Sequence, residues 1–365
     1  MGGEAGGKSS ERWLMSRIIY VTSNRGGEGK TTLSLAIALK ALSSGLRAGY
    51  FKPVAISKTA FGGADPDTAV MEGLLNMSRE NSSPILSVSP QDLLDVDRIR
   101  VEEAVSRIRE RIERLIELYE ILILEGVEGL SFGASIGVSA PALSSIINAK
   151  LFLMARPESD QVIDEIITLN HYCRGFNSRV EAVVFNRVPE LKIERVNAKY
   201  REILMDNGIR VLGVVPERSE LLAPTVRDLN RTLKGEVLAG EAGMDRLAEN
   251  ILIGAMGIEN AAKFIRRSHN SIVITGGDRT DLALTALEAQ VSGIILTGGI
   301  YPSIKILPKA DELSIPIILV PYDTYTTLQI VHEIRGRILP SDDQRMETLK
   351  KLYWENVNLG EMLET

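Results

Sequence analysis

The glycine-rich run from Asn24 to Thr32, which reads Asn-Arg-Gly-Gly-Glu-Gly-Lys-Thr-Thr, constrains the fold most. It lies between a short apolar, β-branched stretch at 17–22 and a helical pattern that begins at Thr31. A strand, a glycine-rich turn and a helix in this order begin a parallel βαβ unit. Glycines let successive backbone N–H groups turn inward around phosphate oxygens, and the helix that follows offers its positive end.

We therefore predict that this loop binds a nucleoside triphosphate with Mg²⁺. Lys30 would reach the β and γ phosphates, and the hydroxyl of Thr31 suits a magnesium ligand. The alternative is a glycine-rich surface turn, which would not need Lys-Thr-Thr at this spacing. The nucleotide-binding residues predicted here are Arg25, Gly26, Gly27, Glu28, Gly29, Lys30, Thr31 and Thr32.

The chain beyond the loop predicts an α/β fold with a parallel sheet and helices on both faces. Continuous apolar runs, rather than alternating ones, are typical of parallel strands that are covered on both sides. A charged amphipathic helix is predicted over 97–120. The further strands are predicted at 48–54, 119–124, 150–155, 181–186 and 210–215.

The alternation of strands and helices pauses after Pro216 and then restarts. Residues 218–250 are mixed and mostly helical in pattern, whereas 271–274, 294–296 and 317–320 are apolar runs typical of strands. This predicts a second, smaller α/β domain. The predicted divisions are a flexible tail at 1–16, a nucleotide-binding domain at 17–222, a second domain at 223–340 and a C-terminal helix at 341–365.

Composition narrows the classes of partner. The net charge of −6 argues against a general nucleic-acid binder, because bulk basic charge is missing. No apolar run approaches the length of a membrane span, so we expect no membrane partner. The only cysteine, Cys173, excludes an intrachain disulfide and suits the reducing cytoplasm. We read Cys173 as a helix-end thiol rather than a catalytic one.

The loop resembles a deviant phosphate-binding sequence, Lys-Gly-Gly-x-Gly-Lys-Thr-Thr, with Arg25 in place of the first lysine. That sequence is found in the P-loop class that contains dethiobiotin synthetase, the cobyrinate amidases and the MinD and ParA ATPases. Lys52-Pro53-Val54 is similar to the Lys-Pro-Val of dethiobiotin synthetase. The resemblance implies that Lys52 lies beside the γ-phosphate and acts with Lys30 in catalysis.

Three further segments resemble dethiobiotin synthetase in the same order along the chain. Glu125-Gly126-Val127-Glu128-Gly129 is similar to its Glu-Gly-Ala-Gly-Gly, whose glutamate helps to hold magnesium. Asn186-Arg187 resembles its base-recognising pair, and the run ending at Pro216 resembles a strand near the base. Glu128 departs from the family's glycines and places a negative charge near the substrate side.

Asp67 is a further candidate ligand for Mg²⁺. The run Asp65-Pro66-Asp67-Thr68 follows Lys52 at a suitable distance, and a carboxylate there would balance the charge of the metal and the triphosphate. Alternatively, Asp65 and Asp67 belong to a solvated turn that caps a helix at 68–77.

The second half resembles the DRTGG domain, which occurs beside a dethiobiotin-synthetase-like module in long phosphotransacetylases. The resemblance rests on Thr275-Gly276-Gly277-Asp278-Arg279-Thr280-Asp281 and on Gly293 to Gly299. It implies a regulatory or dimer-forming role. The two Thr-Gly-Gly turns either receive a ligand or are tight connections, with Asp281 as a helix cap.

Two functions follow as hypotheses. In the first, the chain is ligase-like and transfers the γ-phosphoryl of ATP to a small carboxylate or carbamate, which an amine then attacks. In the second, it is a nucleotide sensor that regulates a partner such as a phosphotransacetylase. We expect a homodimer in either case, because Arg25 keeps a charge that the deviant loops use across a dimer interface.

Overall fold

The computed structural model describes residues 17–56, 66–218, 221, 223–254, 258–334 and 343–364. The predicted tail at 1–16 lies outside the described residues, as does Asp65. The chain divides into two compact units, and the second is inserted into the first. Unit 1 comprises Met1–Glu217 and Ile338–Thr365, and unit 2 comprises Arg218–Arg337.

Unit 1 is built on a six-stranded parallel sheet with the order β2-β5-β1-β6-β7-β8. The strands are β1 (Arg17–Ser23), β2 (Ala48–Phe51), β5 (Ile121–Glu125), β6 (Lys150–Ala155), β7 (Val180–Val188) and β8 (Arg210–Pro216). The interior strand β5 is buried along its whole length. This fully apolar pattern is that of a parallel sheet covered on both faces, as the sequence predicted.

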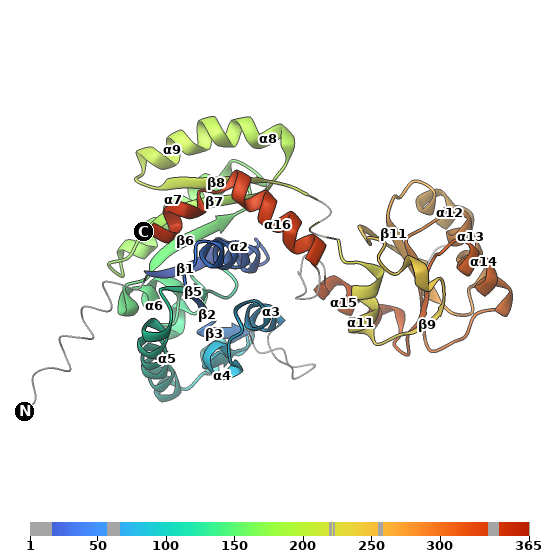
Figure 1. The fold of residues 1–365 in the computed structure, drawn as a ribbon, viewed down its shortest axis with the longest axis horizontal. Coiled ribbons are helices and arrows are strands. Elements are labelled where there is room, and N and C mark those ends of the chain that lie inside the picture. Colours follow the sequence, from blue (N-terminus) through green and yellow to red (C-terminus); the bar gives the residue numbers. More distant parts are fainter. Residues whose placement is uncertain are drawn as a thin grey trace, which may run out of the picture. The chain divides into compact units, whose positions relative to one another are not determined.

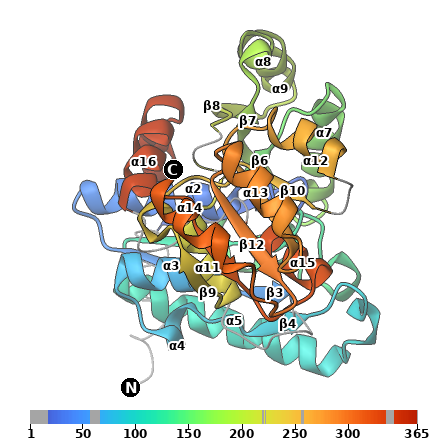
Figure 2. The same ribbon diagram turned by 90° about the vertical axis from the view of Figure 1, so that its right-hand side faces the viewer.

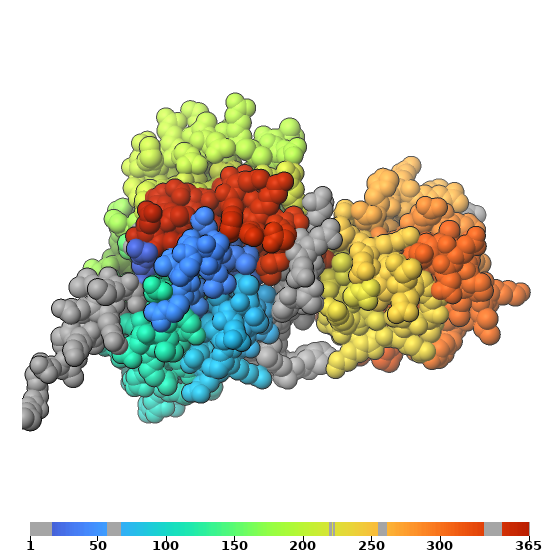
Figure 3. Space-filling view, in the orientation of Figure 1, coloured from blue at the N-terminus to red at the C-terminus, as the bar shows by residue number. Residues whose placement is uncertain are grey.

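Two layers of helices cover this sheet (Figure 1). One layer contains α2 (Lys30–Ser43), α16 (Asp343–Asn356) and α17 (Leu359–Glu364), which contact one another. The other contains α5 (Arg98–Leu118), α6 (Ala140–Ile147) and α7 (Gln161–Arg174), in which α6 packs against both α5 and α7. Figure 3 shows the C-terminal segment, in red, seated against α2, in blue.

Shorter elements complete unit 1. A two-stranded parallel sheet pairs β3 (Val54–Ile56) with β4 (Leu86–Val88). The predicted strand at 48–54 therefore divides at Lys52-Pro53, where β2 ends and β3 begins a different pairing. The remaining helices are α3 (Pro66–Leu75), α4 (Arg79–Ser82), α8 (Glu190–Arg195) and α9 (Arg201–Asp206), with 3-10 turns at Leu93–Asp95 and Ala134–Ile136 and a π-helical turn at Val196–Tyr200.

The C-terminal segment forms two helices, whereas the sequence predicted one. The break lies between α16 and α17, where Val357 pairs with Gly213 of β8 and the Asn358 N–H donates to the Leu212 carbonyl over 2.8 Å. These backbone bonds to the sheet replace helical ones. The segment that follows unit 2 is thus tied directly to the parallel sheet of unit 1.

Unit 2 is a five-stranded sheet with the order β10-β11-β12-β13-β9, in which β9 alone is antiparallel. Its strands are β9 (Glu236–Ala239), β10 (Asn250–Ile253), β11 (Ser271–Gly276), β12 (Gly293–Thr297) and β13 (Ile317–Leu319). The prediction that 218–250 is mostly helical was wrong for β9, which pairs with the buried β13.

Each face of this second sheet has its own apolar core. One core joins the sheet to α12 (Ile258–Ile265), α13 (Thr280–Glu288) and α14 (Leu307–Glu312). The other joins it to α11 (Val226–Leu233) and α15 (Thr324–Ile334). β12 is the middle strand of this sheet (Figure 2). In neither unit do the described residues include a helix long and apolar enough to cross a membrane.

Candidate functional site

The glycine-rich loop joins the carboxyl end of β1 to the first turn of α2. The helix begins at Lys30 behind Gly29, whose φ of 99° is in the left-handed region that favours glycine. No side chain caps this helix terminus. The first-turn N–H groups of α2 therefore lack a side-chain acceptor, which is the condition under which a helix N-terminus receives an anion.

Gly29 is also required by its contact with the end of β7. A Cβ at this position would collide with Nδ2 of Asn186. That amide nitrogen donates to the carbonyl of Glu28 over 2.9 Å, so Asn186 holds the back of the loop. The loop is thus shaped from behind by a residue 158 positions further along the chain.

Lys30 is buried and turned toward the interior of the loop. Its Nζ donates to Oγ of Ser23 over 3.0 Å and to the carbonyl of Glu128 over 2.6 Å. Burial lowers the pKa of Lys30, the Lys52 ammonium lowers it further, and the Glu125 carboxylate opposes both. A phosphate bound at this loop would add negative charge beside Lys30 and so offset the burial that disfavours its charged form.

Thr31, in the first turn of α2, forms a hydrogen bond with Glu125 at the end of β5. The hydroxyl of Thr31 donates to Oε1 of Glu125 over 2.8 Å, and the hydroxyl of Tyr50 donates to Oε2 over 3.2 Å. Glu125 is 1% exposed, and burial raises its pKa, against the influence of the nearby Lys52. A buried carboxylate beside a threonine hydroxyl is a hard-oxygen donor pair of the type that Mg²⁺ prefers.

Asp67 and Lys52 form an ion pair at the neighbouring strand end. Oδ2 of Asp67 lies 3.2 Å from Nζ of Lys52, which is buried. Both charges act on Glu125, since the lysine lowers and the aspartate raises its pKa. In the described part of the chain, no three His, Cys, Asp or Glu side chains gather as a metal site. A magnesium ion here would therefore need phosphate oxygens and water as well.

Asn186 and Arg187 lie within β7, which continues to Val188 rather than ending at 186. The pairing with β8 shifts register here, and Arg187 has a φ of 50°. This irregularity takes the two residues out of the regular ladder. Burial lowers the pKa of the Arg187 guanidinium, and the Glu28 carboxylate opposes that shift.

Glu28 and Pro216 complete the predicted nucleotide residues at this edge. Glu28 is buried, which raises the pKa of its carboxyl, and the Arg187 guanidinium lowers it. Pro216 ends β8 beside Val188. Thr32, on the other side of the loop, is half-buried in the first turn of α2.

Arg25 points away from Lys30. Its guanidinium pairs with Glu165 of α7 and lies 3.5 Å from Glu158. The hydrogen bond to Glu165 is the main cause that raises the pKa of Arg25. The charge of Arg25 is therefore engaged by carboxylates of the same chain rather than directed into the predicted phosphate loop.

The structure adds residues that the sequence did not single out. Ser23 and Tyr50 hold Lys30 and Glu125, and the hydroxyl of Tyr353 donates to Oδ1 of Asn186 over 3.3 Å. Ser23 and Tyr50 could have been found as polar residues on the strands that flank the loop. Tyr353 could not, because it lies on α16 beyond the whole of unit 2.

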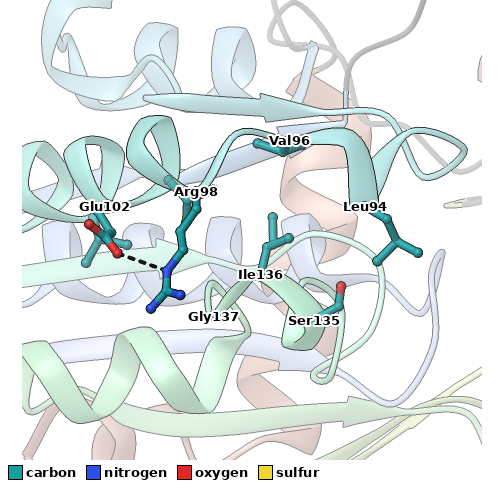
Figure 4. Close-up of a pocket in the computed structure, with 9 residues that line it drawn as sticks. Leu94, Val96, Arg98, Glu102, Ser135, Ile136 and Gly137 are labelled. Atoms are coloured by element: carbon teal, nitrogen blue, oxygen red, sulfur yellow. Dashed lines mark hydrogen bonds and ion pairs between the residues drawn. The ribbon is translucent and has the colours of Figure 1, made fainter.

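A separate cavity of about 670 Å³ lies beside the start of α5 (Figure 4). Its lining is mostly apolar and includes Leu94, Val96 and Ile136. Arg98 reaches the cavity wall but is already paired with Glu102 over 3.2 Å. None of its lining residues belongs to the phosphate loop. A small carboxylate bound there would compete with Glu102 for Arg98.

The Thr-Gly-Gly turns of unit 2 follow β11 and β12, as predicted. Asp281 does not cap α13, because the residue before the helix is Arg279 and makes no side-chain cap. Instead Asp281 accepts from Nε of Arg279 over 3.2 Å, and this interaction lowers its pKa. The alternative in which Asp281 is the helix cap was therefore wrong.

Two family profiles match the chain. A profile described as an AAA domain matches residues 17–225, and one described as a DRTGG domain matches residues 228–334. This pairing confirms the predicted one, a dethiobiotin-synthetase-like P-loop domain joined to a DRTGG domain, as in long phosphotransacetylases.

The similar curated proteins are named phosphate acetyltransferase. That of Nitratidesulfovibrio vulgaris is 24% identical over 95% of this chain and 51% of its own length. That of Pseudomonas putida is 26% identical over 91% of this chain and 49% of its own length. The chain thus spans about half the length of the curated relatives it matches.

Two solved structures are similar at low TM-scores. The CBS and DRTGG domains of a Clostridium perfringens pyrophosphatase, in complex with diadenosine tetraphosphate, match with 22% identity and a TM-score of 0.28. That match covers 43% of this chain and 75% of that one. The MinD cell division protein of Aquifex aeolicus matches with 18% identity and a TM-score of 0.34, over 56% of this chain and 84% of its own.

Proposed function

The chain belongs to the AAA domain family and carries a DRTGG domain after it, and we propose that its first unit binds Mg·ATP at the loop from Asn24 to Thr32. The observation that carries this proposal is the 2.8 Å contact between Thr31 and Glu125 beside the buried Lys30. It supports the proposal because a cation of the kind that binds phosphate and oxygen donors of the kind that Mg²⁺ prefers lie near one helix terminus. We place this activity in the cytoplasm, which a single cysteine suits.

Each phosphate-side residue has a distinct role in this proposal. Lys30 would exchange its present acceptors, Ser23 and the Glu128 carbonyl, for phosphate oxygens. Thr31 and Glu125 would hold Mg²⁺, with Asp67 nearby to balance charge. Bound Mg²⁺ would neutralise the charge that develops on the terminal phosphates.

The base side of the site would be formed by residues at the ends of β7 and β8. Asn186 still has one amide hydrogen and one oxygen lone pair beyond its bonds to Glu28 and Tyr353. Arg187 and Pro216 flank it at the same sheet edge. We propose that these three residues contact the nucleobase.

The first candidate activity is ligase-like transfer of the γ-phosphoryl group to a small carboxylate or carbamate. Lys52 supports it, because a buried ammonium beside Asp67 can be released toward a phosphoryl group when Asp67 turns to the metal. Positioning and charge neutralisation would supply most of the rate. The transfer would release ADP, and an amine would then attack the resulting acyl or carbamoyl phosphate, forming a C–N bond as the C–O bond breaks and inorganic phosphate leaves with loss of the amine proton.

The second candidate is a nucleotide-sensing regulator, alone or as part of a phosphate acetyltransferase such as those it resembles. The observation that favours it is that Glu128 stands where dethiobiotin synthetase has glycine, and that its carboxylate lies against Gly26. A homodimer fits both candidates. For Arg25 to act across a dimer, it would first have to leave Glu165.

Isothermal titration of the full chain with Mg·ATP tests binding. We expect the wild type to bind and Lys30→Ala to bind at least about tenfold more weakly, since it removes charge-assisted hydrogen bonds to phosphate. The matched control is Lys199→Ala, in which an exposed lysine of the same unit is removed. Equal affinity in Lys30→Ala and the wild type would refute the assignment.

A turnover screen separates the two activities. Steady release of ADP that depends on a small carboxylate or a diamine supports the ligase-like enzyme. Tight binding with negligible turnover across the same panel supports the sensor.

A further inference from the structure

Both the backbone and the side chain of Glu128 contact the phosphate loop. A Cβ added to Gly26 would collide with Oε2 of Glu128 and lie 3.1 Å from its Cδ. The carboxylate therefore rests directly over the Gly26 backbone. Gly26 belongs to the stretch whose N–H groups are shaped to turn toward phosphate oxygens.

The backbone of Glu128 is anchored by the cation of the loop. Its carbonyl accepts from Nζ of Lys30 over 2.6 Å and from Oγ of Ser23 over 2.9 Å. The next residue, Gly129, fits so closely that a Cβ there would lie 2.7 Å from the carbonyl oxygen of Asn24. The turn after β5 is thus docked against both ends of the phosphate loop.

This docking holds Glu128 in an unfavourable conformation. Its φ is 34°, in the left-handed region that non-glycine residues rarely adopt. Glycine would meet no such penalty. Only the backbone is fixed, because the side chain is exposed and can rotate away from Gly26.

The position of the carboxylate identifies which part of a nucleotide it opposes. Lys30 of such a loop reaches the β and γ phosphates, and here Lys30 is bonded to the same residue that carries the carboxylate. The carboxylate is therefore at the terminal-phosphate end of the loop. A third phosphate would bring negative charge against it, whereas a diphosphate ends before it.

We propose that Glu128 is a specificity-determining residue of this nucleotide site, and that its carboxylate makes the loop favour nucleoside diphosphates over triphosphates. A triphosphate enters by displacing the side chain into solvent and by taking Lys30 from the Glu128 carbonyl. This inference rests on the proposed nucleotide binding, and it makes the ratio of diphosphate to triphosphate the quantity to which the chain responds.

The test measures the dissociation constants of Mg·ADP and of a magnesium complex of a non-hydrolysable ATP analogue by titration of the full chain. The variants are Glu128→Gln, which keeps the shape and removes the charge, and Glu128→Gly, which also relieves the backbone. Glu202→Gln, an exposed carboxylate of the same unit, is the control for net charge.

We expect Glu128→Gln to tighten binding of the triphosphate analogue about tenfold, since a like charge is removed, and to change ADP binding less than about threefold. Glu128→Gly should behave in the same way, and Glu202→Gln like the wild type. An unchanged ratio would overturn the inference while leaving the nucleotide site intact. Weaker triphosphate binding in Glu128→Gln would also overturn it, because the carboxylate would then act as a ligand of the metal. If no variant binds either nucleotide, the proposed function itself fails.

Discussion

Tyr353 is the residue by which the C-terminal helix α16 contacts Asn186 of the proposed nucleotide site, and its removal should destabilise unit 1. The ring is 1% exposed, and its hydroxyl donates to Asn186 over 3.3 Å. The helix also packs on α2 and β8. Two substitutions separate these contributions, because Tyr353→Phe removes only the hydroxyl and Tyr353→Ala removes the ring as well.

The expected losses differ in size. For Tyr353→Phe we expect the free energy of unfolding to fall by about 1 kcal/mol, since one neutral hydrogen bond is lost and Asn186 keeps another partner. For Tyr353→Ala we expect a fall of about 3–5 kcal/mol, because a buried aromatic ring leaves a cavity. The difference between the two variants measures packing.

Urea denaturation followed by the fluorescence of Trp354 provides the assay. Trp354 is the next residue on α16, and the ammonium groups of Lys40 and Lys350 lie 4.8 Å and 5.1 Å from its ring. The chain has one other tryptophan, Trp13, so the series is made in a Trp13→Phe background. The signal then reports on unit 1 even if unit 2 unfolds separately. An unchanged Trp354 transition in Tyr353→Ala would refute the docking of α16.

Three further predictions concern titratable groups. Burial raises the pKa of Glu125, so its negative charge opposes folding once the carboxyl is ionised. Glu125→Gln should therefore raise the stability of the ligand-free chain at neutral pH. The same variant should bind ATP about tenfold more weakly in the presence of Mg²⁺, which titration of the chain with ATP, with and without EDTA, checks. Burial raises the pKa of the Cys173 thiol to about 12, so the folded chain should resist iodoacetamide at pH 8.5, as mass spectrometry would show. The stability that this thiol contributes should be present below its usual pKa and lost as pH rises toward 12. Hydrogen bonds from Arg195 and Tyr200 lower the pKa of Asp160 to about 2, and an NMR titration of Arg195→Ala should show that pKa moving back up.

The proximity of the phosphate-side residues could be predicted from the sequence. Glu125 follows, and Lys52 lies near the end of, a run that reads as a parallel strand, and the carboxyl ends of such strands meet at one edge of a sheet. The loop before α2 lies at that same edge, so Thr31 and Glu125 were expected to approach each other. Their roles in binding and catalysis stay predictions.

The base side was less predictable, because it depends on contacts between distant parts of the chain. Tyr353 and Asn186 are 167 positions apart, and no local pattern on α16 indicates which residue its helix will face. The single predicted helix at 341–365 also hid the break at Val357, which is set by pairing with β8 rather than by propensity.

Glu128 shows how far a local pattern can be taken. The sequence indicates that a charge replaces glycine beside Glu125, the predicted ligand of Mg²⁺. It does not indicate that the carboxylate rests on Gly26, since that depends on the left-handed turn and on the bond from Lys30. The short strands β4, β9 and β10 also escaped prediction. Each contains exposed positions, whereas the equally short β13 is buried along its whole length and could be predicted from its apolar run.

The most direct test of nucleotide binding is a crystal structure of the full chain with a non-hydrolysable ATP analogue and Mg²⁺. We predict that the triphosphate lies in the loop from Asn24 to Thr32, with Lys30 on its terminal phosphates and Mg²⁺ bound by Thr31 and Glu125. The carboxylate of Glu128 should have turned away from Gly26. A nucleotide bound only in unit 2, or a metal without contact to Thr31 and Glu125, would contradict the account.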